Sequence, residues 1–178
     1  WLFPSREKII LRSVYNMSLT VYEKYNVEAG KSCLVMGKVT FNVLNQPRTQ
    51  KPNEYVSDPK PEYVVAIEEP KFVKGDENLI NALKETQYGD DNNKLSIRDK
   101  SPFAPTIFGK DNEKTTGDKL IPEGKCLANG QQILIHVTTF KGHGNVGCGF
   151  DAIKLTVPLN EVEITDAGGT VSADVFDI

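Results

Sequence analysis

Four stretches of the chain alternate apolar and polar residues, the pattern of a strand with one buried face. They cover residues 33–45, 62–69, 131–140 and 150–157. The apolar residues that share a face are Val39, Phe41 and Val43; Tyr63, Val65 and Ile67; Ile133, Ile135 and Val137; and Ile153, Leu155 and Val157. In the first stretch, Lys38, Thr40 and Asn42 are expected on the opposite face.

The glycine-rich residues 141–149 separate the last two predicted strands, which indicates a β-hairpin. A different periodicity appears in residues 76–87, where Leu79, Ile80 and Leu83 recur at helical spacing. Acidic and amide residues in its first turn complement the helix dipole, and Gly89 follows its end. We expect one amphipathic helix of about three turns.

Two segments lack either periodicity. Residues 45–61 contain four of the ten prolines, which cannot donate to a sheet ladder, so they predict a long loop. Residues 89–130 are rich in Gly, Pro, Asn and Asp, and only residues 94–98 read as a short strand. A loop-rich insertion of this size in a compact domain usually has a function.

This order of elements predicts a mainly β protein. Four or five strands with a single helix favour a small closed or partly open barrel, of which the OB-fold is the commonest. A β-sandwich would need about seven strands at short, regular spacing. The expected fold is therefore an OB-fold-like five-stranded barrel with one amphipathic helix and long loops.

The length of 178 residues suits one domain. Because Met17-Ser18-Leu19 reads like a natural start, residues 1–16 are interpreted as an N-terminal extension or a cloning remnant; an ordinary packed segment is the alternative. No apolar run is long enough to span a membrane, and no secretory signal is recognisable. The three cysteines are widely spaced without a CxxC pair, which fits a reducing compartment.

The net charge of −3 hides a separation of charge along the chain. Residues 1–154 hold 21 basic and 19 acidic side chains, and no basic residue follows Lys154. Residues 159–178 are therefore interpreted as an acidic tail that screens a basic surface and binds partner proteins; the alternative is an ordinary frayed terminus. The predicted partner-binding residues are Glu161, Glu163, Asp166, Asp174, Phe176 and Asp177.

Catalytic and metal-binding patterns are weak. His136 and His143 accompany neither a serine elbow nor an HExxH motif. The G-x-G-x-x-G run at residues 142–147 precedes a strand, whereas a dinucleotide loop precedes a helix. His143 and Cys148 offer two zinc ligands where a structural site usually has four. We therefore predict no catalytic residue, no metal and no cofactor.

Basic and aromatic residues interleave in the predicted loops. This combination binds single-stranded nucleic acid, because cations follow the phosphates while rings stack on unpaired bases. For any single residue the simpler interpretation is a core ring or a solvated charge. The full set of basic and aromatic loop residues also includes Phe108, Lys110 and Phe140. The residues predicted to bind DNA are Arg48, Lys51, Tyr55, Lys71, Phe72, Lys74, Arg98, Lys100, Phe103 and Lys141.

Residues 127–155 resemble the C-terminal hairpin of bacteriophage single-stranded DNA-binding proteins of the OB-fold type. The last strand of that hairpin matches at Gly147, Gly149, Phe150, Ala152, Ile153 and Leu155. Upstream, the first strand is similar at Gly37, Lys38, Val39 and Phe41, and a helix follows the second strand. The acidic tail is similar too, although it has fewer acids and ends Phe176-Asp177-Ile178 rather than on the Phe.

The resemblance implies that residues 17–158 form a single-stranded DNA-binding domain without enzymatic activity. Such a protein coats and protects DNA in phage replication, recombination or repair, in the cytoplasm of the infected bacterium. Its partners would be single-stranded DNA, replication proteins that bind the tail, and a second copy in a homodimer. The main alternative is a structural or adaptor protein of phage assembly that binds proteins through its loops and tail. A nuclease with a metal held by loop carboxylates ranks third.

Overall fold

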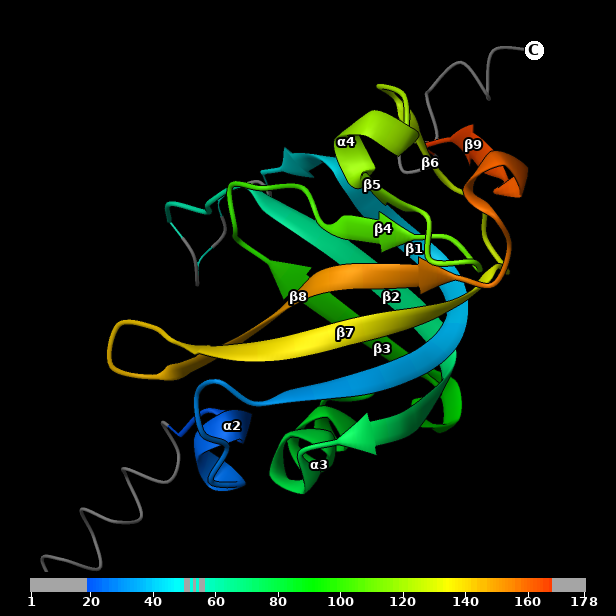
Figure 1. Ribbon diagram of the computed structural model, residues 1–178. Helices are drawn as coiled ribbons and strands as arrows, with labels where there is room; N and C mark the ends of the chain where they lie inside the picture. Colours follow the sequence, from blue (N-terminus) through cyan, green and yellow to red (C-terminus); the bar gives the residue numbers. More distant parts are fainter. Residues whose placement is uncertain (1–18, 50–51, 53, 55–56, 168–178) are drawn as a thin grey trace, which may run out of the picture.

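The computed structural model describes residues 19–49, 52, 54 and 57–167, and it is built around a mixed seven-stranded sheet (Figure 1). The order across the sheet is β3-β2-β1-β7-β8-β4-β5, and all neighbours are antiparallel except β4 and β8. Its strands are β1 (Ser32–Arg48), β2 (Glu62–Gly75), β3 (Lys94–Asp99), β4 (Thr106–Phe108), β5 (Lys114–Thr116), β7 (Gln132–Lys141) and β8 (Val146–Leu155). A second, two-stranded sheet pairs β6 (Lys125–Leu127) with β9 (Ile164–Asp166).

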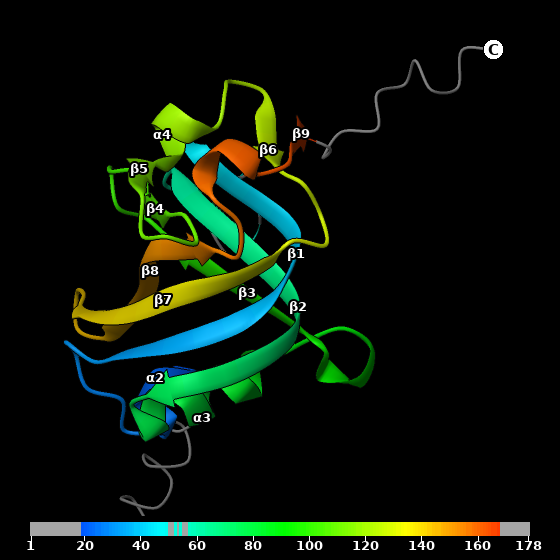
Figure 2. The same cartoon turned by 45° about the vertical axis from the view of Figure 1, so that its right-hand side comes forward.

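The helices lie at the ends of the sheet. The short α2 (Val21–Lys24) and the longer α3 (Glu77–Thr86) lie together at one end, and α4 (Gly117–Leu120) lies at the other (Figure 2). The two 3₁₀ turns are η1 (Asp90–Asn92) and η2 (Leu159–Glu161). The predicted amphipathic helix is confirmed as α3. Its N-cap is Asp76, whose carboxylate accepts from Leu79 N at 3.0 Å. It is not the only helix, since α2 and α4 add two short ones.

The sheet curls around a single apolar core. Gly37 permits part of this curvature, because a Cβ atom there would lie 2.6 Å from Ile67 Cδ1 on the facing strand. The curl brings β3 against β8, although β3 and β5 stand at the ends of the hydrogen-bonded order. The mainly β prediction is confirmed, but no closed barrel is found among the described residues, and the strands number more than five.

The predicted face of β1 is wrong beyond Val39. The pairing of β1 with β2 shifts between Val39 and Phe41, which places one extra residue in β1 and exchanges its faces. As a result Asn42 is 3% exposed while Phe41 is only partly buried. Both ends of the buried Asn42 amide bond to Leu127: its Nδ2 donates to Leu127 O at 2.9 Å and its Oδ1 accepts from Leu127 N at 3.0 Å.

The faces predicted for the other strands agree with the structure over most of their length. Ile133, Ile135 and Val137 of β7 are buried, as are Ile153 and Leu155 of β8. Val157, the third residue predicted to share their face, lies beyond the end of β8 and is only partly buried.

Several predicted boundaries are also wrong. β1 continues to Arg48 and β2 to Gly75, so Arg48, Lys71, Phe72 and Lys74 lie in strands rather than in loops. Residues 89–130 contain β3, which matches the short strand predicted at residues 94–98, and also β4, β5 and β6, which were not predicted. The hairpin turn is reduced to residues 142–145, because β7 and β8 extend into the glycine-rich segment.

The first nine residues of the expected tail, 159–167, are packed onto the domain. Glu163 O accepts from Ala128 N at 3.0 Å and from Gln131 Nε2 at 2.7 Å, while Val162 and Ile164 pack against the core. Glu161, Glu163 and Asp166 therefore belong to η2, β9 and the residues between them. The remaining predicted tail residues, Asp174, Phe176 and Asp177, lie outside the described residues, as does the predicted extension 1–16.

Within the described part of the chain, no helix is long and apolar enough to cross a membrane.

Candidate nucleic-acid interface

A groove of about 530 Å³ lies between the β7–β8 hairpin, the end of β3 and the residues that precede β2. We call it the hairpin groove. Its lining residues are Pro59, Lys60, Glu62, Arg98, Lys100, Phe140, Gly142, His143, Gly147 and Cys148. The curl of the sheet brings these segments together, since they span almost ninety residues of sequence. The hairpin projects on the left of Figure 1, away from β9.

The aromatic surface of the groove is the ring of Phe140. This residue pairs with Gly147 across the hairpin, and a Cβ atom on Gly147 would lie 2.4 Å from Phe140 Cε2. The ring therefore lies over the glycine, on the space that a side chain would fill. Phe140 is nevertheless 46% exposed, so part of the ring faces solvent on a fixed strand pair.

The groove carries three cations and one carboxylate. Arg98 Nη1 bonds to Glu62 Oε1 at 2.6 Å, and the Glu62 side chain is 6% exposed. This pairing neutralises the buried carboxylate and holds the arginine at the groove. Lys60 and Lys100 are exposed, so the lining residues leave an excess of positive charge.

Two further ionisable groups lie near the groove. The Asp99 side chain lies against Gly149 of β8, where a Cβ atom would be 2.6 Å from Asp99 Oδ1. Burial raises the pKa of Asp99, and the nearby Asp151 raises it further, against a backbone hydrogen bond from Ser101 that lowers it. Burial also raises the pKa of Cys148 to about 11, so its thiol adds no charge at neutral pH.

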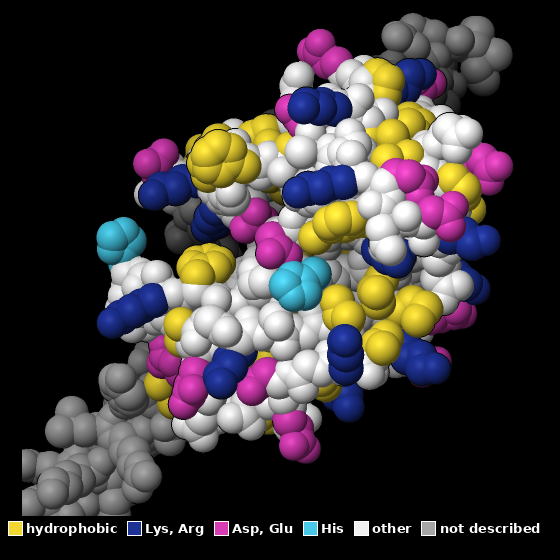
Figure 3. Space-filling view, in the orientation of Figure 1, with side chains coloured by type: hydrophobic (Ala, Val, Ile, Leu, Met, Phe, Trp, Pro, Cys, Tyr) yellow, Lys and Arg dark blue, Asp and Glu magenta, His cyan; other side chains and the backbone are white. Residues whose placement is uncertain are grey.

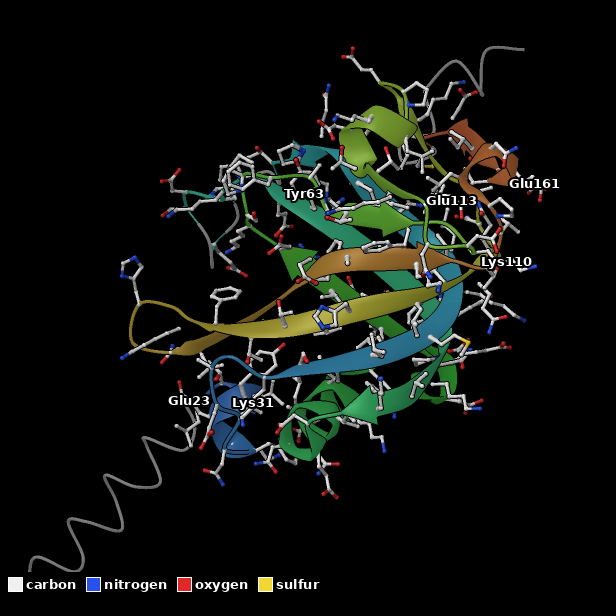
Figure 4. All side chains as sticks on the ribbon, in the orientation of Figure 1. Glu23, Lys31, Tyr63, Lys110, Glu113 and Glu161 are labelled. Carbon is white, nitrogen blue, oxygen red and sulfur yellow. The ribbon has the colours of Figure 1, made fainter. Side chains whose placement is uncertain are left out.

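Figures 3 and 4 show the side chains in the orientation of Figure 1. Figure 3 shows hydrophobic, basic and acidic side chains interspersed on the face that carries β7 and β8. In Figure 4, Lys110, Glu113 and Glu161 lie at the end opposite the hairpin. Tyr63, which follows Glu62 in β2, is 3% exposed and belongs to the core.

The structure brings only some of the predicted DNA-binding residues together. Arg98 and Lys100 line the hairpin groove, and Lys141 is exposed at the start of the hairpin turn. Phe103 is 77% exposed in the loop that follows Lys100, where its N–H donates to Ser101 Oγ at 3.2 Å. Lys51 and Tyr55 lie outside the described residues.

The other predicted residues lie elsewhere. Phe72 is ten residues along β2 from Glu62, a separation of about 33 Å in an extended strand. Lys71 and Lys74 are exposed in that same half of β2. Arg48 lines a different groove, beside Phe41.

Sequence reasoning missed Lys60 and did not select Phe140 from the wider aromatic set. One signal was available for Phe140: a glycine-rich strand directly after a short turn places a glycine opposite the aromatic residue of the preceding strand. No comparable signal marks Lys60, because its neighbours in the groove come from distant segments. Among residues 19–49, 52, 54 and 57–167, no cluster of three or more His, Cys, Asp or Glu side chains could hold a metal ion.

No protein-family model matches this sequence, and no curated protein matches it significantly. Among solved structures, the chain is similar to the single-stranded DNA-binding protein from bacteriophage Enc34, with 11% identity and a TM-score of 0.43 over 81% of this chain and 90% of that one. The same phage protein in complex with single-stranded DNA gives 8% identity and a TM-score of 0.42 over 76% and 89% of the two chains. At these scores, assignment of a function depends on the groove itself.

Proposed function

We propose that this protein binds single-stranded DNA in the hairpin groove, without altering it chemically. The observation that carries the proposal is the exposed ring of Phe140, fixed over Gly147 beside Lys60, Arg98 and Lys100. Stacking of a base on such a ring contributes about 1–3 kcal/mol, and cations along the same groove attract the phosphates.

The strand order supports this assignment. We interpret β1, β2, β7 and β8 as four strands of an OB-type barrel, with β3 and β4 as one interrupted strand. β3 pairs with β2, β4 pairs in parallel with β8, and only residues 100–105 separate them. OB-folds bind oligonucleotides on their second and third strands, between the loops that join strands 1–2 and 4–5. In this interpretation Arg98 lies in the third strand, Lys60 in the loop that joins strands 1 and 2, and His143 in the loop that joins strands 4 and 5.

An exposed ring favours single strands over duplexes. A duplex offers its phosphates to the lysines, but its bases are already stacked and cannot reach Phe140. We assign DNA binding to residues 17–158, and a partner-binding role to the C-terminal residues that follow. A role in phage DNA replication, recombination or repair, in the host cytoplasm, is the biological setting that the sequence resemblance suggests.

The proposal is tested by fluorescence anisotropy with labelled single-stranded DNA, double-stranded DNA and RNA of equal length. We expect tighter binding to the single-stranded DNA than to the duplex. The logarithm of the affinity should fall with the logarithm of salt concentration, by about 0.7 for each phosphate neutralised. Equal affinity for single-stranded and double-stranded DNA, or a complex that salt does not weaken, would exclude this function for the groove.

A further inference from the structure

A second groove, of about 670 Å³, lies against the part of β1 between Thr40 and Val43. We call it the β1 groove. Its other side is formed by residues of β6, β9 and the segment after β6, including Cys126, Asn129 and Thr165. The shift in the pairing of β1 after Val39 leaves Phe41 only partly buried, and Phe41 lines this groove.

Arg48 gives the β1 groove a cation above an aromatic ring. Its guanidinium carbon lies over the Phe41 ring, 4.8 Å from the centroid. Arg48 Nε is buried and has no hydrogen-bond partner among the residues that the structure describes, which is rare for a buried donor in a folded protein. The carboxylate that lines the groove, Asp166, forms an ion pair with Lys125. Arg48 therefore remains available to an anionic ligand.

The two grooves meet at one pair of residues. Arg48 of β1 and Glu62 of β2 are partners in the antiparallel ladder, and the Cα atoms of such partners lie about 4.5–5.5 Å apart. Arg48 lines the β1 groove and Glu62 lines the hairpin groove. Neighbouring residues of one ladder therefore line the two grooves.

We propose that the β1 groove is a second binding site for the same DNA strand, and that it takes the nucleotides that continue beyond the hairpin groove. Arg48 binds a phosphate or stacks on a base, as guanidinium groups do in nucleic-acid complexes, and Phe41 supports it from below. The side chains of Asn129 and Thr165 offer hydrogen-bonding groups at the opposite wall. This inference rests on the proposed function, because it extends the path of the same ligand.

The test compares oligothymidylates of two lengths on the full chain. The short one, of about five nucleotides, fits one groove, and the long one, of about fifteen, fills the range seen for such domains. Arg48→Met should weaken binding of the long oligonucleotide by about tenfold and lower its salt slope by about 0.7, while binding of the short one changes less than about twofold. Phe41→Leu should act in the same direction.

The matched control is Lys74→Met, which also removes one positive charge but lies in the distant half of β2. It should leave the affinity for both lengths within about twofold, apart from a small general effect of charge. Thermal unfolding of each variant checks that the domain remains folded. In addition, a long oligonucleotide that carries 5-iodouracil should crosslink to Phe41 as well as to Phe140, as mapped by mass spectrometry.

The outcomes separate the two proposals. If Arg48→Met weakens both lengths equally, or neither, and no crosslink forms at Phe41, the β1 groove is not part of the DNA path, while the hairpin groove remains a binding site. If the wild-type protein binds neither oligonucleotide, the proposed function itself is wrong.

Discussion

Basic and aromatic residues lie beside both ends of β2, but in different surroundings. At the start of β2, Glu62 lies in the hairpin groove with Arg98 and the ring of Phe140. Towards its end, Phe72 stands between Lys71 and Lys74, a run of cation, aromatic and cation that reads as a nucleic-acid site in the sequence. Of these two rings, that of Phe140 in β7, beside the start of β2, is the more open to a ligand.

The difference lies in what packs on each ring. Phe140 has a glycine opposite it on β8, so its ring lies on the sheet with its outer side in solvent. Phe72 packs against the core, and Lys84 of α3 lies over its ring, 5.8 Å from the centroid. A basic and aromatic composition therefore becomes a binding surface only where the neighbouring residues leave the ring open.

The largest expected effect comes from reversing charges in the hairpin groove, compared with the same change near the end of β2. Lys60→Glu with Lys100→Glu should weaken binding of single-stranded DNA by about a hundredfold at low salt, at roughly tenfold for each cation. Lys71→Glu with Lys74→Glu makes the same change in net charge and should cost less than about threefold. Titrations by anisotropy at two salt concentrations measure both. Equal losses would mean that the whole surface, rather than the groove, attracts DNA.

The aromatic residues come next. Phe140→Ala should reduce affinity for single-stranded DNA by about tenfold, since a stacked base contributes about 1–3 kcal/mol, and should have little effect on stability. Phe72→Ala should lower the free energy of unfolding by roughly 2 kcal/mol, because it removes a partly buried ring, with affinity nearly unchanged. Chemical denaturation and DNA titration of both variants check this. If Phe72→Ala weakens DNA binding and Phe140→Ala does not, the stacking surface lies at Phe72.

A third change replaces Gly147, the glycine that lies opposite Phe140. Gly147→Val introduces a Cβ atom into the space that the Phe140 ring occupies, so the ring must move from its place on the strand pair. Affinity should fall by roughly three- to fivefold, an effect smaller than loss of the ring itself. Combining Gly147→Val with Phe140→Ala should add little, because both act on the same contact. Additive losses would show that Gly147 acts independently of the ring.

The smallest effect concerns Asp99, beside the groove. Burial raises the pKa of Asp99 in the folded state, so the charged carboxylate destabilises the fold at pH values above that pKa. Protonation of the carboxylate removes the destabilisation as the pH falls through the folded-state pKa. Asp99→Asn should therefore raise the melting temperature by roughly 1–3 °C near neutral pH. The gain should shrink as the pH is lowered, which calorimetry across pH values can follow. A constant gain would point to a cause other than the charge.

The predicted strands, hairpin and amphipathic helix follow from local patterns, and the structure contains them. The errors arise where non-local contacts override the pattern. One extra residue after Val39 exchanges the faces of β1, which brings Asn42 inside to bond Leu127 and leaves Phe41 in a groove. The strands within residues 89–130 that were not predicted, β4, β5 and β6, are three residues long, too short to show a period. They form because they pair with β8, β9 and one another.

Local patterns along the chain are enough to predict the mainly β character, the hairpin and the excess of basic and aromatic residues in candidate loops. Alternation and helical spacing are local properties of a chain, so they can be read without knowing its partners. Which of those residues share a groove depends on how the chain folds. Lys60, Arg98 and Phe140 come from three distant segments, and the curl of the sheet that joins them depends on strand pairing along the whole domain. Whether a ring stacks or packs is likewise set by its neighbours in space: glycine beside Phe140, and a helix beside Phe72.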